Sequence, residues 1–600
     1  MLRLKWLIAF CAAGAGIWLV YVGIKFLVPP PPLNVLLITL DTTRADRFGC
    51  YGYEPAQTPT LDRLAREGIL FERAATAAPL TLPAHATLLT GKYPPEHGLH
   101  YNGQNSLGTE IPLLTEILGN RGYRTGAFIG AMVLRAKFGL ARGFQVYDDD
   151  IRGAEPTTGH HDRMRTGETV VSSALAWLQR QPTSKPFFCW VHLYDPHHPY
   201  LPHEDLFGTK FIDRPYDGEM AYIDQQVERL VSDLQARGLT ERTLVIIVGD
   251  HGESLGEHGE STHAYMLYES TMRVPLIATA PRLISPGTRV TGPVSLVDVY
   301  PTILDCLQVP LPQPTLGRSL VPAFRGHDLA PGTCYGETDQ PFGEFHFAPL
   351  KSLTTERWKF VRTPQIELYD LQADRAELKN LAAQHPAEVH DLDAQLSELE
   401  QRMNRGTAPA TQLTAKEQRA LESLGYAGGN SKPSDIKAAP QLRDIKDMIK
   451  SVTHYNEALS LMEVEAYAQA EAVLRPLTIA VPDMFIAHHN LGVCLAAQDQ
   501  NEKAILSYRR ALELRDDGRT RIELGKMYIL TSQWSAAIPH LKAAVQQLPD
   551  SPRPSFYWGE ALRGLHQPQE ARQQYRRALK INPRYTPARQ ALHHLDTSIP

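Results

Sequence analysis

The hydrophobic positions of this chain form one pattern in the first two thirds and another near the C-terminus. Runs of consecutive apolar residues alternate with amphipathic stretches, and the runs lie at 34–40, 187–194, 244–249 and 274–280. Unbroken apolar runs of this length are typical of strands that are buried on both faces, as in parallel sheets. The pattern therefore predicts an α/β domain with a parallel sheet from residue 34 onward.

A different pattern, a repeat of helical type, occupies residues 451–597. A Leu-Gly or Trp-Gly pair recurs every 33 to 34 residues, and an alanine follows each glycine after 12 residues. Small residues at fixed spacing let the two helices of a hairpin approach closely, and stacked hairpins bury a shared core. We expect an all-α solenoid, joined to the first domain by a linker at 428–450 that is rich in Gly, Ser and Pro.

The N-terminus carries a 19-residue uncharged run, 6–24, which Arg3 and Lys5 precede. At about 1.5 Å per residue, such a helix spans roughly the hydrocarbon core of a bilayer. The run is longer than the apolar part of a cleaved signal peptide, so we expect a retained transmembrane signal anchor over 6–28. Because the basic residues stay inside, everything after the anchor is expected outside the cytoplasm, on the periplasmic or extracellular face.

The bulk composition limits the possible functions. Six hundred residues exceed what one hydrophobic core usually supports, in agreement with several folded units. A formal net charge of -5 gives no basic field, so we expect no nucleic-acid partner. The cysteines after the anchor lack the spacing of a metal site, and free thiols and disulfides both remain open. These cysteines are Cys50, Cys189, Cys306, Cys334 and Cys494.

Polar residues follow three of the predicted strands directly. Asp41 ends the first run, His197 lies three residues past the second, and Asp250 and His251 end the third. Ligands of open α/β sheets bind at the carboxyl ends of the strands, so these side chains can converge. The segment TLPAHATLLTG at 81–91 adds a hydroxyl nucleophile, Thr81. Together these residues predict an enzyme of ester cleavage or transfer.

Seven ordered stretches of the chain resemble the sulfatase family, a branch of the alkaline phosphatase superfamily. They are NVLLITLDTTRAD at 34–46, TLPAHATLLTG at 81–91, DPHHPY at 195–200, VGDHGE at 248–253, LYESTMRVPLI at 267–277, SLVDVYPTILD at 295–305 and ELYDLQADRAELKNL at 367–381. The resemblance implies an α/β domain of the alkaline-phosphatase/sulfatase fold over 34–427, with a mixed, mostly parallel sheet flanked by helices. The C-terminal part is similar to tetratricopeptide repeats, which implies a protein partner.

The chain departs from the sulfatase pattern at its nucleophile. Sulfatases carry a Cys or Ser that is oxidised to formylglycine and is followed by Pro and Arg; here these positions hold Thr81, Pro83 and His85. Threonine cannot be converted, so we expect no formylglycine. Thr42 replaces a second Asp, and His251 replaces an Asn. This set is similar to that of phosphonate and phosphodiester hydrolases and phospho-group transferases of the superfamily.

The resemblance implies one divalent metal ion, with the ligands Asp41, Thr81, Asp250 and His251. Such an ion would lower the pKa of the threonine hydroxyl and cancel charge on the transferring group. Nitrogen and carboxylate ligands suit zinc or manganese better than calcium, which prefers sites made only of oxygen. Three further histidines are expected to bind substrate oxygens or to act as acid and base. They are His85, His197 and His263.

The sequence therefore predicts a membrane-anchored, metal-dependent hydrolase or group transferase that acts on a sulfate or a phosphate or phosphonate ester through Thr81. A phospho-group transferase that modifies an envelope glycan or lipid is one alternative, because the sequence does not show whether water or an alcohol takes the group. An inactive scaffold that presents the repeats to partners is another. A decayed site has no reason to keep a coherent ligand set, which argues against the scaffold.

Overall fold

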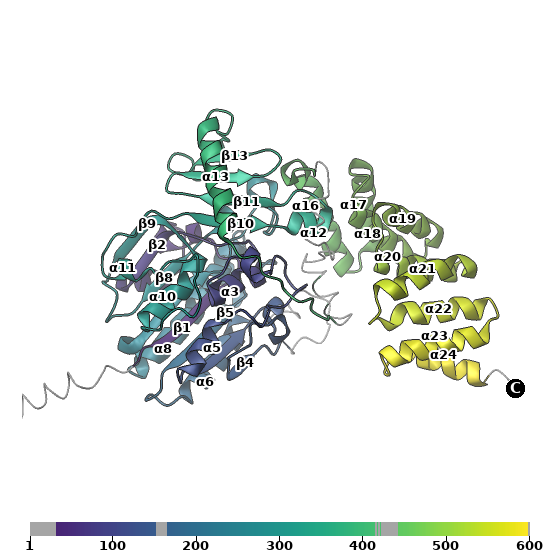
Figure 1. Cartoon of the computed structure of the whole chain (residues 1–600), viewed down its shortest axis with the longest axis horizontal. Coiled ribbons are helices and arrows are strands. Elements are labelled where there is room, and N and C mark those ends of the chain that lie inside the picture. Colours follow the sequence, from purple (N-terminus) through teal and green to yellow (C-terminus); the bar gives the residue numbers. More distant parts are fainter. Residues whose placement is uncertain (1–31, 152–164, 414–416, 418–420, 422–441, 598–600) are drawn as a thin grey trace, which may run out of the picture.

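The computed structural model describes residues 32–151, 165–413, 417, 421 and 442–597 (Figure 1). The expected anchor at 6–28 and most of the expected linker lie outside these residues. None of the helices in the described part combines the length and the apolar composition that crossing a bilayer requires.

The first domain is built on a nine-stranded mixed sheet with the strand order β4-β3-β5-β1-β6-β8-β2-β7, and β9 pairs with β2. β1 lies between β5 and β6 and is parallel to both, whereas β8 is antiparallel to β6 and β2. The strands are β1 (Asn34–Leu40), β2 (Ile69–Ala75), β3 (Arg124–Ile129), β4 (Val146–Asp148), β5 (Phe187–Leu193), β6 (Thr243–Gly249), β7 (Arg273–Val274), β8 (Leu276–Thr279) and β9 (Thr288–Ser295).

The predicted apolar runs are strands of this sheet, and burial on both faces explains their composition. Val35 and Leu37 of β1 pack into one core with α3, α5 and α10, while Leu36 and Ile38 face the opposite core, with α2, α6 and α8. The run at 274–280 forms two short strands, and both are antiparallel to their neighbours. An unbroken apolar run therefore indicates that a strand is buried on both faces, but it does not indicate whether the strand is parallel or antiparallel to its neighbours.

Helices cover both faces of the sheet and connect its strands. They are α2 (Pro59–Glu67), α3 (Thr81–Thr90), α4 (Pro94–His97), α5 (Leu114–Asn120), α6 (Gly167–Gln179), α7 (Glu204–Phe207), α8 (Pro215–Ala236), α9 (Glu269–Met272), α10 (Val299–Cys306) and α11 (Val321–Phe324). The described cysteines are all free thiols.

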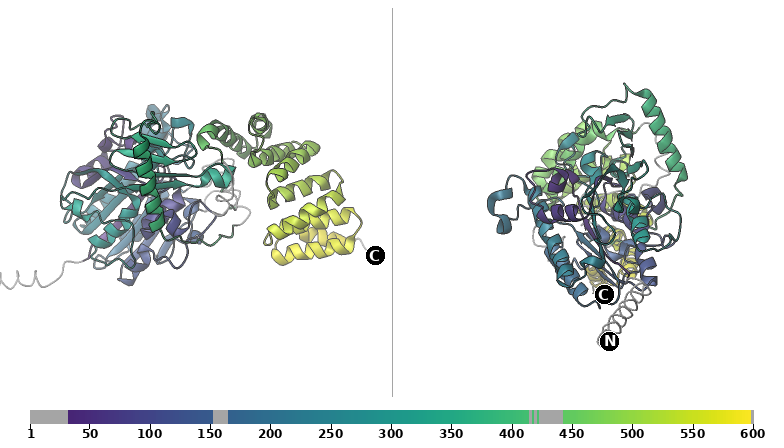
Figure 2. Two further views of the ribbon diagram at one scale, coloured as in Figure 1. Left: turned by 45° about the horizontal axis from the view of Figure 1, so that its top comes forward. Right: turned by 90° about the vertical axis from the view of Figure 1, so that its left-hand side faces the viewer.

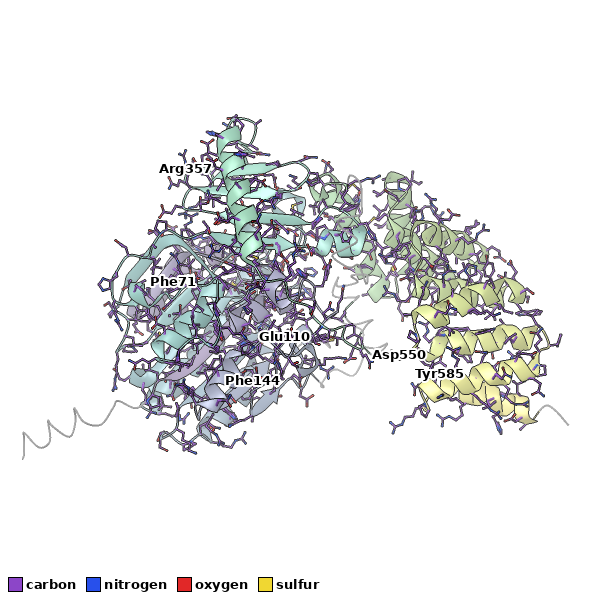
Figure 3. The ribbon with its side chains drawn as sticks, in the orientation of Figure 1. Phe71, Glu110, Phe144, Arg357, Asp550 and Tyr585 are labelled. Atoms are coloured by element: carbon purple, nitrogen blue, oxygen red, sulfur yellow. The ribbon has the colours of Figure 1, made fainter. Side chains whose placement is uncertain are left out.

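A second, four-stranded antiparallel sheet follows, which the sequence did not predict as a separate unit. Its strands are β10 (Cys334–Thr338), β11 (Leu350–Thr354), β12 (Trp358–Arg362) and β13 (Glu367–Asp370), with α12 (Gln340–Phe345) after β10 and α13 (Pro386–Arg402) packed on the sheet. Figure 3 labels Arg357 at this sheet and Phe71 in the large sheet. β10 is buried along its whole length, so its side chains lack the alternation that marks a half-buried strand.

The C-terminal part forms the predicted stack of helical hairpins. The helices are α16 (Ile445–Glu463), α17 (Tyr467–Ala480), α18 (Phe485–Ala497), α19 (Asn501–Leu514), α20 (Gly518–Leu530), α21 (Trp534–Gln547), α22 (Pro552–Gly564), α23 (Pro568–Ile581) and α24 (Thr586–Thr597). A Cβ atom on Gly492 would lie 2.6 Å from Tyr508, and one on Gly559 would lie 2.4 Å from Tyr575. The repeating glycines therefore set the close approach of paired helices.

The repeats begin inside the segment expected to be a linker. Asp444 caps α16 by accepting a hydrogen bond from the backbone N–H of Lys446, so the helix starts at Ile445. Figures 1 and 2 show that the repeats meet the rest of the molecule at this end, while α22 to α24 extend away from it. The first repeats and the segment around Tyr265 share one hydrophobic core.

Candidate active site and metal centre

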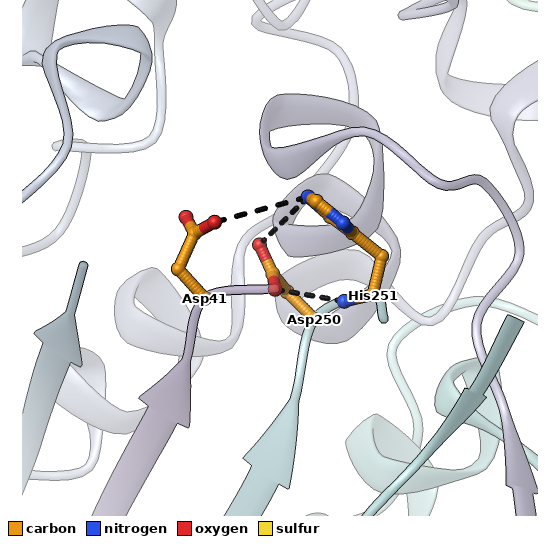
Figure 4. A group of neighbouring side chains, drawn as sticks. All are labelled: Asp41, Asp250 and His251. Atoms are coloured by element: carbon orange, nitrogen blue, oxygen red, sulfur yellow. Dashed lines mark hydrogen bonds and ion pairs between the residues drawn. The ribbon is translucent and has the colours of Figure 1, made fainter. Parts of the chain in front are cut away.

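Two parallel strands place the central carboxylates. Asp41 directly follows β1 and Asp250 directly follows its neighbour β6, so both lie at the same edge of the sheet (Figure 4). The backbone N–H groups of Thr42 and His251 donate to Asp250 Oδ1 at 3.2 and 2.7 Å. These bonds fix one carboxylate oxygen and leave Oδ2 directed toward the other residues.

Asp41, Asp250 and His251 offer ligand atoms that all lie within 4.8 Å of one another, and we call them the ligand group. His251 Nε2 lies 3.6 Å from Asp250 Oδ2 and 4.0 Å from Asp41 Oδ1. All three side chains are fully buried. The structure thus brings together the three residues that the sequence placed after β1 and β6.

The electrostatics of the ligand group fit a bound cation. Both oxygens of Asp41 and Oδ2 of Asp250 are buried, and none has a hydrogen-bond partner among the described residues. Burial raises the pKa of both carboxyls well above the ordinary value, and the charge of Asp41 raises the pKa of Asp250 further. Two neighbouring carboxylates in this position are costly unless a cation lies between them.

The imidazole of His251 is oriented as a metal ligand. Its Nδ1 lies 3.0 Å from the carbonyl oxygen of Gly252, which can only accept, so Nδ1 carries the proton. Burial lowers the pKa of His251 well below the ordinary value, which keeps the ring neutral. Nε2 therefore presents a lone pair to the two carboxylates. A carbonyl group that fixes the tautomer in this way is the usual partner of a ligating histidine.

Thr81 opens α3 and lies beside this group. Its Oγ1 is 3.3 Å from His251 Nε2, so the hydroxyl donates toward the ring. The adjoining N–H of Leu82 donates to Asn102 Oδ1 at 2.8 Å. Asn102 is buried, and its Nδ2 has no hydrogen-bond partner in the described part of the chain. Asn102 was not among the predicted site residues, since an isolated Asn in a loop carries no motif.

His85 lies beneath the ligand group. Its Nδ1 donates to the carbonyl oxygen of Thr81 at 2.7 Å, and its Nε2 lies 3.0 Å from Thr39 Oγ1. The ring is fully buried, and burial lowers its pKa well below the ordinary value. Because both nitrogens are engaged inside the protein, the geometry supports a positioning role for His85. The expected contact of His85 with substrate stays a prediction.

A second buried histidine, His192, was missed from the sequence. Its Nε2 lies 3.3 Å from Asp41 Oδ2 and its Nδ1 lies 3.0 Å from Thr39 Oγ1, which also accepts from Trp190 Nε1 at 2.9 Å. His192 sits within the apolar run of β5, where a single polar residue reads as a core position. Its partner in the register is Thr39 of β1, and that pairing directs it to the site.

His197 and His263 line the remaining side of the site. The ring of His263 lies 4.6 Å from that of His251 and 5.2 Å from that of His197, which stacks on Tyr194. Both keep 5% of their surface exposed, whereas the ligand group has none. Among the histidines of the site, these two rings are therefore the ones with some contact to solvent.

Glu253 positions His263, a relation that the sequence did not indicate. Its Oε1 lies 3.0 Å from His263 Nδ1. Burial lowers the pKa of His263, but the charges of Glu253, Asp41 and Glu260 outweigh burial, and the net pKa lies above the ordinary value. His263 is thus the histidine of the site whose surroundings favour the protonated ring.

A second cluster of histidine and carboxylates lies at the end of β10, and it differs in one respect. His100 Nδ1 lies 2.6 Å from Glu337 Oε1 and 3.6 Å from Asp339 Oδ2. Burial lowers the pKa of His100, yet the two carboxylates outweigh it and raise the pKa to about 9. The protonated ring offsets the charge of one carboxylate, so this cluster has less need of a cation than the ligand group.

Comparisons with known proteins agree with the two-part organisation. Residues 33–309 match the family model Sulfatase, and residues 256–405 match N-sulphoglucosamine sulphohydrolase, C-terminal. Residues 455–519 and 552–585 match tetratricopeptide repeat models. Among curated proteins, Arylsulfatase K of Xenopus laevis is 26% identical over 419 residues, which cover 56% of this chain and 77% of that protein. An ulvan-active sulfatase of Formosa agariphila is 24% identical over 450 residues, covering 68% and 87%.

Solved structures share the fold at low sequence identity. A structure in complex with D-glucosamine-2-N,6-O-disulfate superposes with a TM-score of 0.54 at 20% identity, covering 62% of this chain and 98% of that one. The phosphonate monoester hydrolase of Agrobacterium radiobacter superposes with a TM-score of 0.52 at 22% identity, covering 64% and 98%. The chain thus combines a domain of the sulfatase family with a C-terminal array of tetratricopeptide repeats.

Proposed function

We propose that the sulfatase-family domain is a metal-dependent ester hydrolase in which Thr81 attacks the phosphorus or sulfur atom of the substrate. The observation that carries the proposal is the position of Thr81 Oγ1, 3.3 Å from His251 Nε2, beside three buried carboxylate oxygens of Asp41 and Asp250 that lack hydrogen-bond partners among the described residues. A divalent cation held by Asp41, Asp250, His251 and Thr81 would lower the pKa of the threonine hydroxyl and offset the negative charge of the transferring group. Mixed nitrogen and oxygen ligands favour zinc or manganese.

The residues of the site divide the reaction between them. The Thr81 hydroxyl passes its proton to solvent as its oxygen forms a bond to phosphorus or sulfur, and the bond to the ester alcohol breaks. The departing alkoxide takes a proton from an imidazole on the solvent side, for which His263 and His197 are placed. A water molecule then attacks the same atom and gives a proton to that imidazole, while the Thr81 oxygen leaves and takes a proton back from solvent.

Threonine favours phosphorus over sulfur as the atom attacked. A formylglycine hydrate releases sulfate by collapsing to an aldehyde, whereas a threonine ester has to be cleaved by a second attack. That attack is well suited to phosphothreonine, and the route for a sulfate ester is less direct. Both kinds of relative occur: curated sulfatases match the chain, and a phosphonate monoester hydrolase shares its fold. We therefore place phosphate and phosphonate esters first and sulfate esters second.

The proposal is tested with purified protein on aryl sulfate, phosphate monoester, phosphodiester and phosphonate substrates. Thr81→Ala is expected to lower turnover on the order of 10³-fold or more with folding intact, and Thr81→Ser is expected to keep part of the activity because the hydroxyl survives. Intact-mass analysis should show an unmodified Thr81 before reaction. Turnover of Thr81→Ala within about tenfold of wild type would mean that water attacks directly.

The cellular setting is a separate part of the proposal. The apolar run at 6–24 supports a membrane anchor, and the basic residues before it support an orientation with both domains outside the cytoplasm. An envelope glycan or lipid ester would then be within reach, and the repeats would bind a protein partner there. Protease added to intact spheroplasts should digest both domains, whereas full protection would reverse the orientation.

A further inference from the structure

The loop that carries His263 is closed on itself. In this segment, which runs from Glu253 to Tyr265, the N–H of Ser254 donates to the carbonyl of Thr262 at 2.6 Å. Nearer the tip, the N–H of Gly256 donates to the carbonyl of Glu260 at 3.0 Å. Glu253 and His263 lie at the base, 3.0 Å apart. Because these two backbone hydrogen bonds join the two sides of the loop, a displacement of its tip would also move its base, where His263 lies.

One side of the loop is held by the first domain. Arg44, three residues after Asp41, donates from Nη1 to the carboxylate of Glu257 at 2.6 Å and to the carbonyl oxygen of Glu253 at 3.2 Å. The guanidinium is buried, and the paired charges keep it in place. This contact ties the loop to the segment that carries the ligand group.

The other side is held by the first helix of the repeats. Thr453 Oγ1 on α16 lies 3.2 Å from the carbonyl oxygen of Gly259 and 3.0 Å from that of Ile449 in its own helix, and its hydroxyl hydrogen can donate to either. Gly259 has a φ of +83°, and a Cβ atom there would lie 3.2 Å from Ile449 Cγ2. The backbone at the tip of the loop thus rests against the buried side chain of Ile449 without an intervening side chain.

The chain that leaves the loop is also buried against the repeats. Tyr265 and Met266, two and three residues after His263, belong to the core that includes Ile449, Val452 and Tyr455 of α16. Tyr265 also donates to the buried carboxylate of Glu344 at 3.0 Å. In the same core the ring of Tyr455 packs edge-on against Phe345 at 5.5 Å. The tip of the loop and the chain that leaves it after His263 therefore both pack against α16.

We propose that α16 is a positioning element of the active site, and that Ile449 and Thr453 are positioning residues which act on His263 through Gly259. The first helix of the repeats then supports the loop that carries His263, in addition to any role of the repeats in binding a partner. The part that concerns catalysis rests on the proposed function, whereas the part that concerns loop order does not.

The test uses full-length protein and separates loop positioning from repeat stability. Ile449→Ala is expected to lower kcat about tenfold while KM stays within about twofold, because the substrate still binds the ligand group. Thr453→Val should lower kcat in the same direction, and Thr453→Ser should restore it, because the hydroxyl bond to Gly259 returns. Leu474→Ala is the control, since Leu474 is a fully buried residue of α17 in the same core.

Hydrogen exchange of residues 254–262 gives a readout that does not need activity. The amides of Ser254 and Gly256 should exchange faster in Ile449→Ala than in Leu474→Ala. Equal exchange in the two variants, or an equal loss of kcat, would overturn the proposal and leave α16 as a merely structural helix. If the wild type cleaves none of the esters, the proposed function fails, and the exchange experiment alone decides whether α16 orders the loop.

Discussion

The two clusters of histidine and carboxylates in the first domain have similar composition and different electrostatics. In the ligand group, His251 donates a hydrogen bond to a backbone carbonyl and turns a lone pair toward two carboxylates, which have three oxygens without partners in the described part. In the cluster at β10, His100 Nδ1 lies 2.6 Å from Glu337 Oε1, and the charges of this pair offset each other. Residue types alone therefore do not separate the two clusters, whereas the direction of the histidine proton does.

The largest expected effect comes from removing one carboxylate of the ligand group, and the matched change in the β10 cluster is its control. Asp250→Asn should lower ester hydrolysis on the order of 10³-fold and abolish stoichiometric metal, since it takes away a ligand and half of the buried charge. Asp339→Asn is the matched change in the other cluster and should leave metal content at one per chain. Metal analysis of the purified variants checks this comparison. Loss of metal in Asp339→Asn would show that the second cluster binds an ion as well.

Metal removal should have a smaller effect, on stability. Cation binding to the folded state alone adds about 2.7 kcal/mol when the free ion exceeds its Kd by 100-fold, so chelation should lower the melting temperature of the wild type. In Asp250→Asn the same chelator should produce no shift. A shift of equal size in both proteins would place the stabilising ion away from the ligand group.

The smallest expected effect is a pH dependence at the β10 cluster. The pKa of His100 is raised to about 9, above the ordinary value of about 6.5. Its contribution to stability is therefore complete below pH 6.5 and is lost as the pH rises through 9. The melting temperature of wild type should exceed that of His100→Gln most at pH 6, and the difference should vanish near pH 10. A difference that grows with pH would contradict a protonated His100.

Much of the fold and part of the site could be predicted from the sequence. Asp41 and Asp250 were recognisable because each ends an apolar run, and the carboxyl ends of neighbouring parallel strands meet. His192 was not, because its role arises from the pairing of Thr39 with β5, which is a property of the sheet. The contact of Thr453 with Gly259 joins residues 194 positions apart, so no local pattern could indicate it.

The hydroxyl of Thr39 has a consequence for the charge around Asp41. Thr39 has a single hydroxyl hydrogen, which can serve only one of the two histidines beside it, while its oxygen accepts from Trp190. A neutral His85 donates its Nδ1 proton to the carbonyl oxygen of Thr81 and therefore accepts from Thr39 through Nε2. His192 then donates to Thr39 from Nδ1, and its Nε2 faces Asp41 Oδ2 at 3.3 Å with a lone pair. Neither ring thus brings a positive charge to Asp41, and a cation bound there would fill that role.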